Sequence, residues 1–105
     1  ACQSVLAMTL TLGPSSSRVL AIQSHVVHGC VGNRAAVLPL QLLGLETDVL
    51  NTVQFSNTPD HGSFAGEKLT GDQLWALLQG MHANGLLAPS HLLTGYMGSV
   101  GALRA

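Results

Sequence analysis

Charged side chains are scarce in this chain of 105 residues, and aromatic side chains are scarcer still. Asp, Glu, Lys and Arg together make up 9% of the sequence and aromatic residues 4%, whereas hydrophobic residues make up 47%. Globular domains usually contain about 25% charged residues. We therefore expect much of the surface to be covered, either by the rest of a longer chain or by a second subunit. A small, weakly soluble domain is the alternative.

Other absences exclude whole classes of function. The four cationic residues are scattered and the net charge is −1, so no basic stripe is available to bind nucleic acid. No apolar run approaches the roughly 18 residues that a membrane span needs. Two cysteines cannot form the framework of several disulfides that is typical of small secreted domains, which favours a reducing, cytoplasmic location. We expect neither nucleic acid nor a membrane as a partner.

The chain divides at a run of small residues. Residues 1–17 are mostly apolar and end in Gly-Pro-Ser-Ser-Ser, a composition typical of linkers. We expect this segment to be an extension outside the fold. Residues 18–105 then form an incomplete domain, because the last element has the pattern of a helix that the chain does not complete.

The patterns in the second part alternate between strand and helix. Strands are predicted at 18–24, 48–55 and 91–94, and helices at 32–43 and 70–84. This β-α-β-α-β order predicts an α/β fold with a parallel sheet and right-handed crossovers.

Capping and breaking residues mark the ends of the two helices. Asn33 is the expected N-cap of the first helix, Pro39 should kink it, and Gly44 should end it. Thr70 is the expected N-cap of the second helix, and Gly85 should end it.

The residues at the strand ends suggest a ligand site, because ligands of open α/β sheets bind at the carboxyl edge of the strands. The residues that leave the three strands are Ser24-His25, Phe55-Ser56-Asn57 and Gly95-Tyr96. Their hydroxyls, amide and aromatic rings suit a flat ring compound with polar substituents. Each has a structural alternative, since Ser24 could cap a loop and Phe55 could be core. Residues 56–66 are rich in turn formers and predict a mobile flap.

Other candidate motifs give weaker signals. His25, His28 and Cys30 could supply metal ligands, but zinc needs a fourth ligand or an open position, so we expect no metal site. Gly29 and Gly32 precede a helix without matching the dinucleotide or P-loop patterns. Nucleophile motifs and paired carboxylates are absent from the sequence, and we expect no catalytic residue in this segment.

Three motifs carry a resemblance to a known family. They are VLAIQSHVVHGCVGNRAA from Val19, NTVQFSN from Asn51 and LLTGY from Leu92. In this order and spacing they resemble the N-terminal part of the pyridoxal kinases, which belong to the ribokinase-like superfamily. The resemblance runs from about residue 18 to residue 96, and it implies the front part of a ribokinase-like fold.

The resemblance implies a cytoplasmic, homodimeric enzyme that uses ATP to phosphorylate the 5′ hydroxyl of pyridoxal, pyridoxine or pyridoxamine. Ser24 would bond the polar edge of the pyridine ring, and Val31, Phe55 and Tyr96 would surround the ring. The ATP site, the Mg²⁺ and monovalent cation sites and the catalytic aspartate would lie beyond residue 105. The segment would therefore carry the vitamer pocket and be inactive alone.

One part of the pattern departs from the family, whose flap reads F-S-N-H-T-(G/Q)-Y. Here the run is F-S-N-T-P-D-H, so Pro59 stands in place of a threonine that helps hold the substrate. Thr58 lies one residue early, and His61 replaces a tyrosine. We expect either that Thr58 makes the contact through a shifted flap or that the contact is lost. His61 is a possible flap contact or a solvated loop residue.

Two other functions remain open. A truncated isoform could bind the vitamer or form dimers without catalysis. A dinucleotide-binding oxidoreductase would share the β-α-β pattern, but the sequence lacks its glycine fingerprint and the acidic residue that follows.

Overall fold

The computed structural model describes residues 8–11, 17–98 and 100–104. Its elements in chain order are β1 (Met8–Thr11), β2 (Arg18–His28), α1 (Asn33–Leu42), β3 (Glu46–Asn57), the 3₁₀ helix η1 (Pro59–His61), β4 (Gly66–Lys68), α2 (Gly71–Ala83), β5 (His91–Thr94) and α3 (Val100–Arg104). Among these helices, none has the length and apolar character to cross a membrane.

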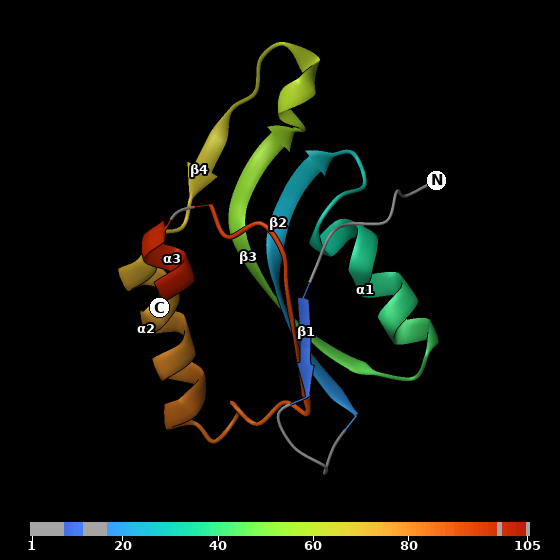
Figure 1. The fold of residues 1–105 in the computed structure, drawn as a ribbon, viewed down its shortest axis with the longest axis vertical. Coiled ribbons are helices and arrows are strands. Elements are labelled where there is room, and N and C mark those ends of the chain that lie inside the picture. The colour runs from blue at the N-terminus through green and yellow to red at the C-terminus, as the bar shows by residue number, and fades with distance from the viewer. Residues whose placement is uncertain (1–7, 12–16, 99, 105) are drawn as a thin grey trace.

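The strands form one five-stranded sheet in the order β1-β5-β2-β3-β4 (Figure 1). β2 pairs in parallel with β3 and with β5, while β1 and β4 are antiparallel at the two edges. The central β2-α1-β3-α2-β5 order confirms the predicted β-α-β-α-β fold. The two antiparallel edge strands were not predicted.

The crossover connections determine on which face of the sheet each helix lies. The chain moves from β2 to β3 through α1 and returns past β2 to β5 through α2. Because both crossovers of such a sheet are right-handed, α1 and α2 lie on opposite faces, as Figure 1 shows. After β3 the chain adds β5 on the other side of β2, so the order of strand addition reverses between β2 and β5. Open α/β sheets bind ligands at such a switch point.

The main core lies between the sheet and α2. It consists of Leu20, Ile22, Leu50, Leu74 and Ala102. α2 begins at a capping box, in which the Thr70 Oγ1 accepts from the Gln73 amide at 3.1 Å and the Gln73 side chain accepts from the Thr70 amide at 2.9 Å. This confirms the predicted cap.

An irregularity between β2 and β3 sets which side chains face this core. β3 has one extra residue where the register shifts, opposite the span from Gln23 to His25. Side chains of a strand point alternately to the two faces of the sheet, and an extra residue shifts this alternation by one position. Leu50 therefore packs in the main core before the irregularity, and Val53 and Phe55 form a second cluster after it.

Two sequence-based expectations about element ends were wrong. β2 does not end at Ser24 but continues to His28, because pairing with β3 extends along its whole length. Asn33 is not the N-cap of α1, a position that Gly32 takes without a side-chain bond. Asn33 is buried instead, and its Nδ2 donates to the Leu50 carbonyl at 3.1 Å and to the Asn51 Oδ1 at 2.8 Å.

The predicted extension at residues 1–17 contains a strand of the sheet. Met8–Thr11 forms β1 and pairs with β5 from Met8↔Thr94 to Thr11↔His91. The edge of a sheet presents unpaired N–H and C=O groups that an extended segment can satisfy. Residues 1–7 and 12–16 lie outside the described part of the chain.

Candidate functional site

A cavity of about 410 Å³ lies where β2, β3 and β5 end. The residues that line it are Ser24, Val26, Val31, Phe55, Thr58, Pro59, Phe64, Lys68 and Tyr96. All five residues that were expected to bind substrate are in this set. His61, the possible flap contact, is not. The cavity lies at the switch point between β2 and β5, where open α/β sheets bind ligands.

Ser24 is held at the cavity by the loop that follows β2. Gly32 has a φ of +55°, and a Cβ at this position would lie 2.2 Å from the Ser24 carbonyl oxygen and 2.5 Å from its Oγ. A residue with a side chain would clash there, so glycine lets the loop backbone close on the serine. The Ser24 side chain is half-buried. Within the described residues its hydroxyl makes no hydrogen bond to the protein, so it can bond a ligand.

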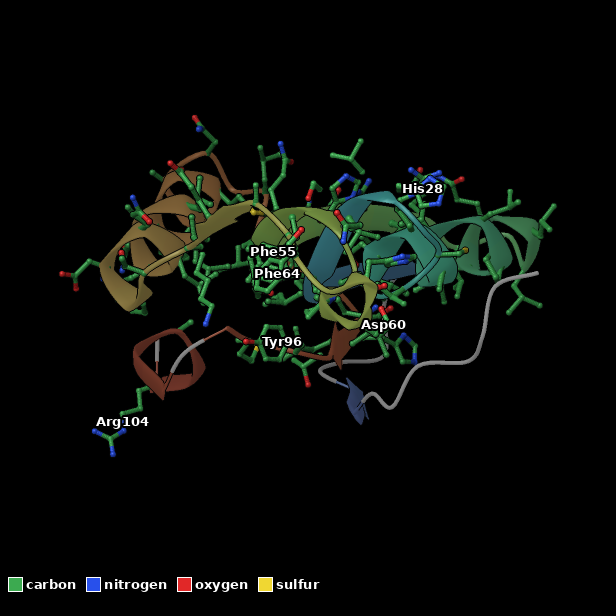
Figure 2. The ribbon with its side chains drawn as sticks, turned by 90° about the horizontal axis from the view of Figure 1, so that it is seen from above. His28, Phe55, Asp60, Phe64, Tyr96 and Arg104 are labelled. Carbon is green, nitrogen blue, oxygen red and sulfur yellow. The ribbon has the colours of Figure 1, made fainter. Side chains whose placement is uncertain are left out.

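Aromatic rings form much of the wall. Phe55 is buried, Phe64 is 47% exposed and Tyr96 is 52% exposed. The Phe55 and Phe64 ring centroids lie 4.7 Å apart at a tilt of 54°, and Figure 2 labels both rings and Tyr96, which comes from the segment after β5. The Thr52 hydroxyl donates to the Tyr96 carbonyl at 2.5 Å and fixes this segment against β3. Such rings bury a flat apolar ligand efficiently.

Hydrogen bonds within the flap (residues 56–66) shape the opposite side. Asn57 Nδ2 donates to the carbonyls of Thr58 at 2.9 Å and of Ser63 at 3.0 Å. The Ser56 hydroxyl donates to Asn57 Oδ1 at 2.7 Å and accepts from the Ala65 amide at 3.0 Å. These bonds brace both ends of the turn, so the segment that carries Thr58 and Pro59 has a defined conformation.

The Thr58 hydroxyl donates to the Asp60 carboxylate. This bond, with smaller contributions from the Asp60 backbone and His61, lowers the pKa of Asp60 below its ordinary value of 3.8. Because the proton of Thr58 is directed at Asp60, its oxygen presents lone pairs to other partners. Thr58 can therefore accept a hydrogen bond from a ligand in the cavity.

The histidines and the cysteine of the H-x-x-H-x-C motif are not gathered into one site. His25 lines a separate hollow beside α1, whereas the His28 ring contacts the His61 ring at 6.3 Å between centroids. Cys30 is disulfide-bonded, which the sequence did not indicate. Among the described residues, no three His, Cys, Asp or Glu side chains are grouped as a metal site.

Sequence reasoning missed four of the lining residues: Val26, Pro59 as a lining group, Phe64 and Lys68. Val26 was missed because β2 was expected to end two residues before it. Phe64 and Lys68 were missed because β4, which follows the flap and returns beside β3, was not predicted. An aromatic residue within a polar turn segment was the available signal for Phe64.

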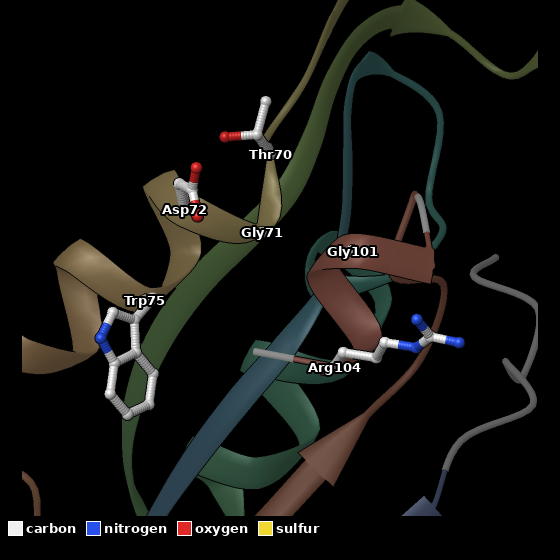
Figure 3. A pocket seen from close by; sticks show the side chains of 6 residues that line it. All are labelled: Thr70, Gly71, Asp72, Trp75, Gly101 and Arg104. Carbon is white, nitrogen blue, oxygen red and sulfur yellow. The ribbon is translucent and has the colours of Figure 1, made fainter.

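A second, more open hollow of about 470 Å³ lies between the start of α2 and α3 (Figure 3). Its lining residues are Thr70, Gly71, Asp72, Trp75, Gly101 and Arg104. The two helices pack closely here, since a Cβ at Gly71 would come within 2.4 Å of the Gly101 carbonyl oxygen. The hollow lies away from the ends of β2 and β3 and contains none of the expected site residues.

Comparison with known proteins identifies relatives of the chain, although no family model matches it. A pyridoxal kinase from Arabidopsis thaliana is 52% identical over 96 residues, which cover 91% of this chain and 31% of the relative. Pyridoxal kinase PdxY from Pseudomonas fluorescens is 50% identical over 88 residues, covering 83% of this chain and 30% of the relative. The chain is homologous to the pyridoxal kinases.

Solved structures agree with this relationship. A pyridoxal kinase from Leishmania donovani in complex with ADP and pyridoxamine has a TM-score of 0.78 and 37% identity, covering 85% of this chain and 31% of that chain. A pyridoxal kinase from Trypanosoma brucei has a TM-score of 0.78 and 39% identity, covering 86% and 33%. The chain thus spans about a third of the length of the pyridoxal kinases that it matches.

Proposed function

We propose that this chain is the N-terminal, vitamer-binding segment of an ATP-dependent pyridoxal kinase. The observation that carries the proposal is that Ser24, Val31, Phe55 and Tyr96, the residues that the family resemblance assigns to the substrate, line one cavity at the strand ends. The enzyme would phosphorylate the 5′ hydroxyl of pyridoxal, pyridoxine or pyridoxamine. The ATP, Mg²⁺ and monovalent cation sites would lie beyond residue 105.

The cavity suits a hydroxylated pyridine. Phe55 and Tyr96 would enclose the flat ring together with Val31, while the Ser24 hydroxyl would bond its polar edge. Thr58 would accept a further bond from the ligand in place of the family threonine, since Pro59 has no side-chain donor. Phosphoryl transfer depends on positioning and charge stabilisation, and this segment would supply the positioning of the acceptor.

The ligands of related structures support this assignment. Pyridoxal kinases from Leishmania donovani were solved with ADP and pyridoxamine and with ADP and pyridoxine. Their similarity to this chain makes a pyridine vitamer the first ligand to test, with ATP as the phosphoryl donor. The homodimer and the cytoplasmic location remain predictions.

Ser24→Ala tests the proposed pocket. If the hydroxyl bonds the ring, its loss should weaken pyridoxine binding by about 1–3 kcal/mol, which is roughly a tenfold to hundredfold change in affinity. Titration calorimetry gives the affinity, and a thermal melt of the same sample shows whether the variant is folded. Ser63→Ala, an exposed flap residue outside the cavity lining, is the matched control. Unchanged pyridoxine binding in folded Ser24→Ala protein would contradict the proposal.

A second candidate is a vitamer-binding protein without kinase activity, which would use the same cavity of aromatic and hydroxyl side chains. A phosphorylation assay with ATP, Mg²⁺ and pyridoxal separates the two. We expect the 105-residue chain alone to form no pyridoxal phosphate above a control without protein. Kinase activity of the natural protein in the same assay would support the enzyme, and binding without turnover would support the second candidate.

A further inference from the structure

Lys68 occupies an unusual position in the cavity. It is the one lysine of the sequence and the one charged residue among those that line the cavity. In the pairing of β4 with β3 it lies directly opposite Val53, and opposite residues of antiparallel strands project from the same face. Val53 packs with Phe55, so the lysine side chain leaves the sheet on the side of the cavity.

The amine is not engaged by an acidic neighbour. Both salt bridges within the described residues belong to Arg18, which pairs with Glu46 and Asp48 at the start of the sheet. A lysine that lines an otherwise uncharged cavity of aromatic and aliphatic residues is placed to meet the ligand. Its chemistry offers more than charge, because an amine reacts reversibly with an aldehyde.

We propose that the Lys68 amine captures the aldehyde vitamer, pyridoxal, as a reversible imine, an inference that rests on the proposed function. The neutral Nζ attacks the carbon of the 4′ aldehyde and forms a carbinolamine. The carbonyl oxygen then leaves as water with the two protons of the amine, and a carbon–nitrogen double bond remains. The step uses no oxidant or reductant, and water reverses it.

The imine has a consequence for the proposed reaction. Free pyridoxal closes on itself, because its 5′ hydroxyl adds to the neighbouring aldehyde and forms a cyclic hemiacetal. In that form the oxygen that accepts the phosphoryl group is blocked. Once the aldehyde is an imine with Lys68, the cyclic hemiacetal cannot form, and the 5′ hydroxyl is free to accept the phosphoryl group. Pyridoxine and pyridoxamine have no aldehyde, so the effect is specific to pyridoxal.

Reductive trapping tests the imine. The folded protein is incubated with pyridoxal and treated with sodium borohydride, which converts an imine to a stable secondary amine, and peptide mass spectrometry locates the pyridoxyl group. We expect one group on Lys68, with half-maximal labelling at a pyridoxal concentration about tenfold lower than in urea-unfolded protein, because the cavity positions the reactants. Equal labelling of folded and unfolded protein would overturn the inference.

Lys68→Arg is the control variant, since arginine keeps the positive charge but does not form this imine. It should lose the label, and its affinity for pyridoxal should fall about tenfold further than its affinity for pyridoxine does. An equal loss for both vitamers would show that Lys68 acts by packing or charge, against the imine.

Pyridoxine separates this inference from the proposed function. Failure of the unsubstituted protein to bind pyridoxine by calorimetry would remove the proposed vitamer pocket. Pyridoxine binding without preferential labelling of Lys68 by pyridoxal would leave the pocket intact and refute the imine alone.

Discussion

The two walls of the cavity are built in different ways. The strand wall (Ser24, Val26 and Phe55) belongs to long paired strands, and Val26 and Phe55 are 2% and 7% exposed. The flap wall (Thr58, Pro59 and Phe64) consists of half-buried and exposed side chains on a segment held by hydrogen bonds between residues close in sequence. Substitutions in the strand wall should therefore lower the free energy of unfolding more than substitutions in the flap wall.

Paired aromatic truncations should show this difference most strongly. Phe55→Ala removes a buried ring and should lower the free energy of unfolding by about 3–5 kcal/mol. Phe64→Ala removes the ring that Phe55 contacts, but this ring is 47% exposed, so the loss should be about 1 kcal/mol. Denaturant unfolding of the two variants measures the difference, and similar losses would mean that the walls do not differ as described.

Two glycines provide the next comparison, because both have a positive φ but only one is crowded. Gly32→Ala would place a Cβ 2.2 Å from the Ser24 carbonyl oxygen and should cost about 2–4 kcal/mol from strain and overpacking. Gly62→Ala, in the flap, meets nothing within 4 Å and should cost about 1–2 kcal/mol from backbone strain alone. Thermal unfolding measures both, and a larger loss for Gly62→Ala would contradict the crowding found at Gly32.

The smallest expected effect concerns Asp60. The Thr58 hydroxyl lowers the pKa of this carboxyl from its ordinary value of 3.8. Any stabilisation from this bond is therefore fully present above that pH and is lost as the pH falls through the lowered folded-state pKa. Thr58→Val should return the pKa of Asp60 toward 3.8, which an NMR titration of the carboxyl measures. An unchanged pKa would show that the bond does not form in solution.

The sequence predicted the central elements because their signals are local. Alternating and helical apolar patterns indicated β2, α1, β3, α2 and β5, and His91–Thr94 was placed to the residue. The capping box at Thr70 involves a residue only three positions away. The positions of the strand ends brought Ser24, Phe55 and Tyr96 together as one candidate site, and the resemblance to a family added Val31 and Thr58.

The elements that were missed depend on pairing partners. β1 and β4 are short edge strands, defined by hydrogen bonds to β5 and β3 rather than by their own composition. The length of β2 beyond Ser24 likewise follows from its pairing with β3. The sequence of a segment alone does not show which neighbouring strand will pair with its backbone N–H and C=O groups.

The sequence by itself determined the α/β alternation, the caps of α2 and the residue types that suit a hydroxylated pyridine ring. Only the tertiary structure decided that Phe64 and Lys68 join these residues, because it returns β4 alongside β3 and so places Lys68 opposite Val53. It also decided that Asn33 serves the core instead of a helix cap. The physical reason is the same in both cases: burial and pairing are set by residues distant in sequence, and local propensity does not specify them.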